Sequence, residues 1–217
     1  MKKIIFILII GIAFSMNINA QDDYVVNAQK ATYGSYNHPK MVWTFDYSMG
    51  FSTGELNDFI SAPAFRGFYM DGRGFINDNI SIGGGIGWNI FYDDYPRSTY
   101  EFNGGAITGQ RWDYFFVMPL VVNAHYYFTH QGQIQPRVGL STGGYYTERE
   151  VQIGNLYVYD HSWQYGITPE IEVYIPFGTS DWGLNVSGKY NILFYNDDKM
   201  DMSNYFSLNV GLTFEPF

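Results

Sequence analysis

The stretch WDYFFVMPLVVNAHYYF, residues 112–128, has an apolar residue at every second position. Asp113, Asn123 and His125 interrupt the opposite set. A period of two is that of an extended strand whose two faces meet different surroundings. The apolar set runs through Trp112, Tyr114, Phe116, Met118, Leu120, Val122, Ala124, Tyr126 and Phe128. The stretch therefore predicts a long strand with one wholly apolar face.

The same alternation recurs along the chain, and no helical period of 3.6 residues competes with it. Strands are predicted at 43–51, 66–76, 80–90, 112–128, 134–146, 163–175, 182–194 and 205–214. No helix-length pattern lies between them, which excludes parallel strands joined by crossover helices. No later segment holds 18 consecutive apolar residues, as a membrane-spanning helix would need.

The connectors between the predicted strands alternate in length. The short ones are 77–79, 129–133 and 176–181, and the long ones are 52–64, 92–110, 147–162 and 196–204. An even number of strands with alternating short and long connectors is typical of bacterial outer-membrane barrels. The predicted fold class is therefore all-β: an eight-stranded antiparallel up-and-down transmembrane β-barrel.

The first 20 residues, MKKIIFILIIGIAFSMNINA, have the features of a secretory signal peptide. Lys2 and Lys3 precede an apolar run of 11 residues, too short for the roughly 20 that span a bilayer. Cleavage is predicted after Ala20. The predicted parts are a signal peptide at 1–20, a loose periplasmic leader at 21–40 and the barrel at 41–217.

Composition excludes several classes of function. The chain has 217 residues, 12 Lys and Arg against 21 Asp and Glu, and a net charge of −9. This balance argues against a nucleic-acid partner, because such proteins usually carry a basic patch. The absence of Cys excludes disulfides, thiolate metal sites, cysteine nucleophiles and a lipid-modified N-terminal Cys. No cofactor or metal site is predicted.

The polar strand face decides which side of the barrel meets lipid. A soluble lipocalin-like barrel encloses its apolar face, whereas a membrane barrel turns it outward. The charges on the polar face are too few for a surface in water, and they suit a narrow lumen in which opposite charges pair. The predicted lumen charge network is Asp46, Asp71, Arg73, Arg137, Glu170, Glu172 and Lys189.

All five tryptophans belong to the apolar face. Trp43 and Trp182 open strands at the predicted inner rim, while Trp88, Trp112 and Trp163 lie at the predicted outer rim. Two girdles of interfacial aromatic residues are a signature of membrane barrels. The five tryptophans are therefore predicted to form these girdles.

Four segments make the chain resemble the small outer-membrane β-barrel domain family, whose architecture is that of OmpA-, OmpX- and OmpW-like proteins. They are FRGFYMDGRGFINDNISIGGGIGW at 65–88, PLVVNAHYYF at 119–128, IQPRVGLSTGGYY at 134–146 and YFSLNVGLTF at 205–214. The resemblance implies a monomer in contact with outer-membrane lipid and lipopolysaccharide. It also implies recognition by the barrel-assembly machinery through a terminal aromatic residue, either Phe214 or Phe217.

Candidate catalytic residues are few. His125 is the one histidine within a predicted strand, and no His-x-Ser arrangement of the kind a lipid-A deacylase-like barrel needs occurs. We interpret His125 as a hydrogen-bonding residue of the lumen. Asp93-Asp94 and Asp160-His161 are predicted on long loops, where barrel proteases hold such pairs. The acidic group of Asp197, Asp198 and Asp201 is interpreted as surface charge.

The sequence therefore predicts a non-enzymatic barrel of the outer membrane with a lumen filled by side chains. The expected role is structural, a surface interaction through the connectors 92–110 and 147–162, or a narrow and mostly closed pore. Two alternatives remain open at this point: a lipid-A-modifying or proteolytic barrel enzyme, and a soluble lipocalin-like secreted binder.

Overall fold

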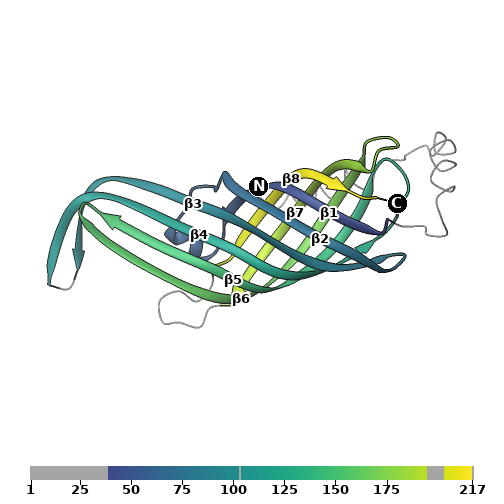
Figure 1. Cartoon of the computed structure of the whole chain (residues 1–217). Helices are drawn as coiled ribbons and strands as arrows, with labels where there is room; N and C mark the ends of the chain where they lie inside the picture. Colours follow the sequence, from purple (N-terminus) through teal and green to yellow (C-terminus); the bar gives the residue numbers. More distant parts are fainter. Residues whose placement is uncertain (1–38, 103, 195–202, 217) are drawn as a thin grey trace. The chain divides into compact units, whose positions relative to one another are not determined.

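A computed structural model describes residues 39–102, 104–194 and 203–216, which all belong to one compact unit, Ser35–Phe217. Each strand pairs antiparallel with the next, and the last closes onto the first (Figure 1). The predicted eight-stranded antiparallel barrel is confirmed. Its elements are β1 (Met41–Ser52), α3 (Glu55–Phe59), β2 (Arg66–Asn77), β3 (Ile80–Phe102), β4 (Gly105–Tyr127), β5 (Gln135–Ile153), β6 (Leu156–Pro176), β7 (Trp182–Phe194) and β8 (Tyr205–Phe214).

Some predictions concern residues outside those that the structure describes. They are the signal peptide at 1–20, nearly all of the leader at 21–40, the acidic group Asp197, Asp198 and Asp201, and Phe217. Across the residues that are described, no helix has both the length and the apolar character needed to cross a membrane.

The barrel wall is apolar outside and polar inside. In β1, Trp43, Phe45 and Tyr47 are each at least 40% exposed, whereas the intervening Thr44 and Asp46 are 1% exposed. The other strands alternate in the same way around the barrel. This arrangement is the reverse of a lipocalin-like barrel and is that of a barrel whose wall faces lipid.

Four strands continue well beyond the closed barrel, which corrects the prediction of long loops at 92–110 and 147–162. β2 pairs with β3 only as far as Arg66 opposite Ile90, yet β3 and β4 remain paired up to Phe102 opposite Gly105. β5 and β6 stay paired up to Ile153 opposite Leu156. We call residues 92–102, 105–114, 148–153 and 156–161 the external sheet. Figure 1 shows these strands projecting past their shorter neighbours.

The loop prediction was wrong because apolar alternation is needed only where one strand face meets lipid. The strands of the external sheet keep residues that favour extended backbone, such as Thr99, Thr108, Val151 and Tyr157, but lose the strict alternation. Hairpin pairing then satisfies their backbone groups without any apolar pattern. Asp93-Asp94 and Asp160-His161 consequently lie on strands rather than loops.

The predicted loop 52–64 contains a short helix, α3, that packs into the outer end of the barrel. Leu56 and Ile60 are fully buried, and Phe59 is 7% exposed. They join an apolar cluster with inward side chains of the wall. The other buried members are Ala64, Phe91, Phe115, Val117, Val121, Tyr145, Leu193 and Tyr205. We call this cluster the apolar plug.

Candidate functional site: a lumen closed at two levels

The inner half of the lumen holds a chain of ion pairs centred on Glu172 of β6. Arg137 of β5 donates from Nη1 to Glu172 Oε1 at 2.9 Å, and Arg73 of β2 donates from Nη1 to Glu172 Oε2 at 3.1 Å. Arg73 Nε also lies 2.9 Å from Asp71 Oδ1. All four side chains are at most 1% exposed, so their opposite charges compensate one another away from water.

Glu215 completes this chain of charges, and the sequence analysis missed it. The residue follows β8, and its carboxylate pairs with Nη2 of Arg137. The Arg137 guanidinium lies between the rings of Tyr127 and Tyr174, 4.5 Å from each ring centroid. Glu215 falls after Phe214, the last alternating residue of β8. No periodic signal marks it.

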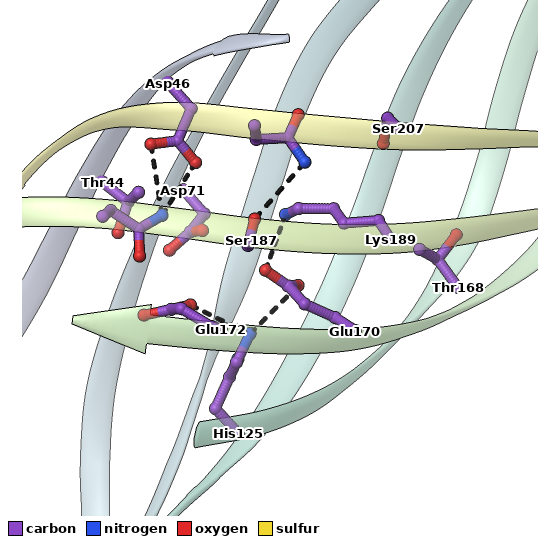
Figure 2. Close-up of polar contacts among 12 residues, drawn as sticks. Thr44, Asp46, Asp71, His125, Thr168, Glu170, Glu172, Ser187, Lys189 and Ser207 are labelled. Atoms are coloured by element: carbon purple, nitrogen blue, oxygen red, sulfur yellow. Dashed lines mark hydrogen bonds and ion pairs between the residues drawn. The ribbon is translucent and has the colours of Figure 1, made fainter. Parts of the chain in front are cut away.

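A second group of charges lies beside the first. Lys189 Nζ is 3.1 Å from Glu170 Oε1 and 3.4 Å from the centroid of the Tyr69 ring. Glu170 Oε2 is 3.2 Å from Nε2 of His125, whose ring lies over Gly139 of β5, where no side chain stands in its way. Figure 2 shows Lys189, Glu170, His125 and Glu172 converging from three strands.

The group of His125, Glu170 and Glu172 resembles a metal site in composition. One ligand-type atom from each lies within 4.8 Å of the others. However, Lys189 already compensates Glu170, while Arg73 and Arg137 already compensate Glu172. A divalent cation there would meet three fixed positive charges within the same low-dielectric space. The group therefore fits ion pairing better than metal binding.

Further polar side chains fill the lumen around these ion pairs. Asn185 donates to both carboxylate oxygens of Asp46, at 2.9 and 3.2 Å. Thr168 donates to Asn191 at 3.0 Å. An interior cavity lined by residues that include Tyr69 has a volume of about 10 Å³, which is room for a single water.

The apolar plug closes the lumen above this polar layer. Phe91 contacts Phe115 and Tyr205, with ring centroids 6.1 and 5.7 Å apart. Arg149 of β5 places its guanidinium 4.0 Å from the Phe59 ring, against α3. The lumen is thus closed twice in series, by charge pairing on the inner side and by apolar packing on the outer side.

The structure brings six of the seven predicted network residues into ion pairs. Asp71, Arg73, Arg137, Glu170, Glu172 and Lys189 form these pairs. The seventh, Asp46, is bound by Asn185 rather than by a cation. Neither Arg137 nor Lys189 lies on the outer wall.

The tryptophans form two outward rows with one exception. Trp43 and Trp182 both lie opposite Phe214, and the Trp182 and Phe214 rings are 5.0 Å apart. At the other rim, Trp163 packs on Tyr146 with ring centroids 5.5 Å apart, and Trp88 packs on Phe68 at 5.2 Å. Trp112 lies opposite Asp94 on the external sheet, six residues along β4 from Met118, which pairs with Tyr146.

In each of the two residue pairs weighed as candidate protease residues, Asp93-Asp94 and Asp160-His161, the two members point to opposite faces of their strand. Asp160 lies on the inner face of β6 opposite Arg149, whereas the adjacent His161 faces outward onto the rings of Tyr146 and Tyr159. Neighbouring residues of a strand point to opposite faces, so Asp160 and His161 cannot share a substrate atom. Asp93 instead accepts a hydrogen bond from Tyr95.

The inner face of the external sheet carries its own ion pair, in which Asp113 is buried and Arg111 is partly exposed. Arg111 donates from Nε and Nη2 to the two oxygens of Asp113, at 2.7 and 2.6 Å. These hydrogen bonds raise the pKa of the Arg111 guanidinium above its ordinary value. The Arg111 guanidinium also lies 5.4 Å from the centre of the Tyr95 ring. The external sheet is therefore an ordered structure with specific side-chain packing.

Comparison with known proteins identifies the fold. No family model matches the chain, and no curated protein matches its sequence. Neisserial surface protein A is similar in structure, with 15% identity, a TM-score of 0.53 and coverage of 81% of this chain and 97% of its own. Ail of Yersinia pestis has 9% sequence identity and a TM-score of 0.46, and the match covers 83% of this chain and 100% of Ail. The N-terminal β-barrel domain of Pseudomonas aeruginosa OprF has 11% identity and a TM-score of 0.42, and the match covers 82% of this chain and 99% of that domain. The chain thus shares the closed eight-stranded barrel fold of Neisserial surface protein A.

The ion-pair chain predicts a large cost for removing its central cation. Arg137→Met should lower the free energy of unfolding by about 3–5 kcal/mol, because Glu172 and Glu215 lose a buried partner. Urea unfolding in micelles, followed by tryptophan fluorescence, measures this loss. Adding Glu215→Gln should restore part of it. The matched change Arg97→Met, at an exposed position, should have little effect, and an equal loss in both single variants would contradict the network.

Proposed function

We propose that this protein is an integral barrel of the outer membrane with no catalytic role, and that its closed lumen makes it a rigid support for the external sheet. The observation that carries the proposal is the double closure of the lumen. A barrel that conducts solutes needs a continuous aqueous path, whereas here an ion-pair layer and an apolar plug lie in series. The external sheet is then the part of the protein that is available to interact with other molecules.

The outer wall supports membrane insertion. Large apolar side chains such as Leu120, Val122 and Ile171 are 56–68% exposed at mid-height of the wall. In water such a surface would drive aggregation, whereas in lipid it is the stable arrangement. The two rows of outward tryptophans mark the expected interfaces. The predicted signal peptide supplies a route to this membrane.

The lumen supports a non-catalytic role. His125, the histidine that the sequence analysis considered for catalysis, is 1% exposed and lies against Glu170. The apolar plug lies between it and the outer end of the barrel. Water and substrate therefore have no open path to its ring. We propose a surface-interaction role for the external sheet, with membrane lipid and lipopolysaccharide around a monomeric wall.

Cell fractionation tests the location. The mature protein should be recovered with outer membranes, and its electrophoretic mobility in SDS should change on heating, because the closed barrel resists the detergent until its strands separate. Recovery in the soluble periplasmic fraction, or a mobility independent of heating, would contradict the proposal. The Leu120→Arg variant should be depleted from the membrane, since Arg facing mid-membrane lipid costs about 2–4 kcal/mol.

Planar-bilayer recordings test the closed lumen. Wild type should show no steady conductance. Lys189→Ala frees the Glu170 carboxylate but leaves the plug in place, and Leu56→Ser with Phe59→Ser loosens the plug but leaves the ion pairs. Each should conduct poorly, while the triple variant should pass cations, because both barriers in series are then weakened. A large steady conductance of wild type would refute the double closure.

A further inference from the structure

The outer face of the external sheet contains a shallow aromatic groove of about 300 Å³. Its lining comes from three adjacent strands: Tyr92 of β3, Trp112 and Tyr114 of β4, and Glu150 and Gln152 of β5. Tyr92 lies opposite Tyr114, Tyr114 opposite Glu150, and Trp112 opposite Gln152. The strand register therefore fixes three rings beside one carboxylate and one carboxamide.

The groove lies beyond the proposed membrane interface. Tyr92 is four residues past Trp88 along β3, which is about 13 Å of extended strand and, at a strand tilt of about 35–45°, about 10 Å along the membrane normal. The polar interface of a bilayer adds only about 5–7 Å to each side of its hydrocarbon core. Lipid chains thus do not explain the aromatic character of this face. Tyr92 is 45% exposed, so its ring is available to a ligand.

Charged residues of both signs lie around the groove. Asp94 lies opposite Trp112, and Glu148 and Glu150 follow on β5. Among the described outward-facing residues of the external sheet on β4, β5 and β6, none is Lys or Arg. Arg66, at the start of β2, lies on the opposite side, and both it and Glu150 are close enough to act electrostatically on Tyr114. Acidic residues therefore lie on both β3 and β5 around the groove, and Arg66 of β2 is a basic residue beside them.

This chemistry selects among cations. A primary ammonium is strongly hydrated and needs several hydrogen-bond acceptors, whereas the groove offers mainly ring faces and the Glu150 carboxylate. A quaternary ammonium spreads its charge over methyl groups, makes no hydrogen bonds and binds to the faces of Trp and Tyr. A phosphate carried beside it would face Arg66.

We propose that the groove of Tyr92, Trp112, Tyr114 and Glu150 binds a phosphocholine group, with the trimethylammonium over the rings and the phosphate toward Arg66. The inference rests on the proposed function in placing the external sheet in water. An exposed site with three rings and one carboxylate corresponds to weak binding, with a Kd on the order of 1 mM. Phosphocholine can be free or lipid-borne, and the experiment below separates the two.

Saturation-transfer NMR on the choline methyl signal tests the site. The full barrel is placed in phosphatidylglycerol nanodiscs, which contain neither choline nor sugar, and empty nanodiscs supply the background. Phosphocholine should give saturable transfer, and choline should bind more weakly. Tighter binding of lysine amide or of methyl glucoside than of phosphocholine would overturn the proposal, as would the absence of saturable binding.

Paired variants separate the site from general surface effects. Trp112→Leu keeps apolar bulk but removes the ring, and it should weaken phosphocholine binding about five- to tenfold. Trp163→Leu removes an outward tryptophan outside the groove and should change binding less than about twofold. Glu150→Gln should weaken binding, whereas Glu101→Gln should not. Arg66→Ala should abolish the preference for phosphocholine over choline. Equal effects of Trp112→Leu and Trp163→Leu would overturn the site.

A vesicle arm identifies the source of the group. Phosphatidylcholine vesicles that capture wild-type nanodiscs, and capture fewer Trp112→Leu nanodiscs, indicate a lipid-borne headgroup. Binding of soluble phosphocholine without vesicle capture indicates a free or glycan-borne group. The heat-dependent mobility of the nanodisc sample is measured in parallel. A barrel that inserts normally but binds no phosphocholine defeats this inference alone, while failure to insert defeats the proposed function.

Discussion

The rest of the structure depends on how charges are compensated inside a narrow barrel. Glu172 is held between Arg73 and Arg137, and neither arginine could face outward without exposing a full charge to lipid. This constraint sets the phase of strands β2, β5 and β6 together, because a one-residue slip in any of them would turn a charge to the outer wall. The apolar exterior and the paired interior are therefore two consequences of one choice of register.

The same constraint explains why the closed barrel could be predicted from the sequence and the external sheet could not. Within the wall, each strand must present apolar residues to lipid at every second position, so strands such as 182–194 and 205–214 could be read with their observed bounds. Beyond the wall neither strand face meets lipid, and the strict alternation ends while the strands continue. A method based on alternation therefore stops too early at Ile90 and at Tyr146.

The lumen shows a similar division. Charged residues inside strands could be placed by their phase, and six of the seven meet in ion pairs. Glu215 and the apolar plug carry no such signal, because they come from segments outside the alternating pattern. Leu56 and Phe59 belong to a helix of five residues, too short for a helical period to emerge. Phe91 and Phe115 are aromatic residues on the otherwise polar inner face of the strands. Their presence there is explained by α3, which packs against them inside the barrel.

Under the proposed function, the surface available for interaction is the external sheet, outside the membrane. Ion pairs and the plug keep the wall rigid, and the wall holds the four strands that present Trp112 and Tyr114 to the medium. The groove on this sheet owes its aromatic character to neither lipid contact nor core packing. The barrel fold does not require aromatic and charged residues at these positions of the external sheet.

Cysteine accessibility tests the central claim most directly, because the natural chain contains no Cys. Single variants Val158→Cys, on the external sheet, and Ser187→Cys, in the lumen, are treated in intact cells with a membrane-impermeant maleimide. Val158 is 63% exposed and Ser187 is 1% exposed. The account predicts rapid labelling at position 158 and labelling at position 187 only after the barrel is unfolded. Labelling of position 187 in the folded protein, or protection of position 158, would contradict a closed lumen beneath an external sheet.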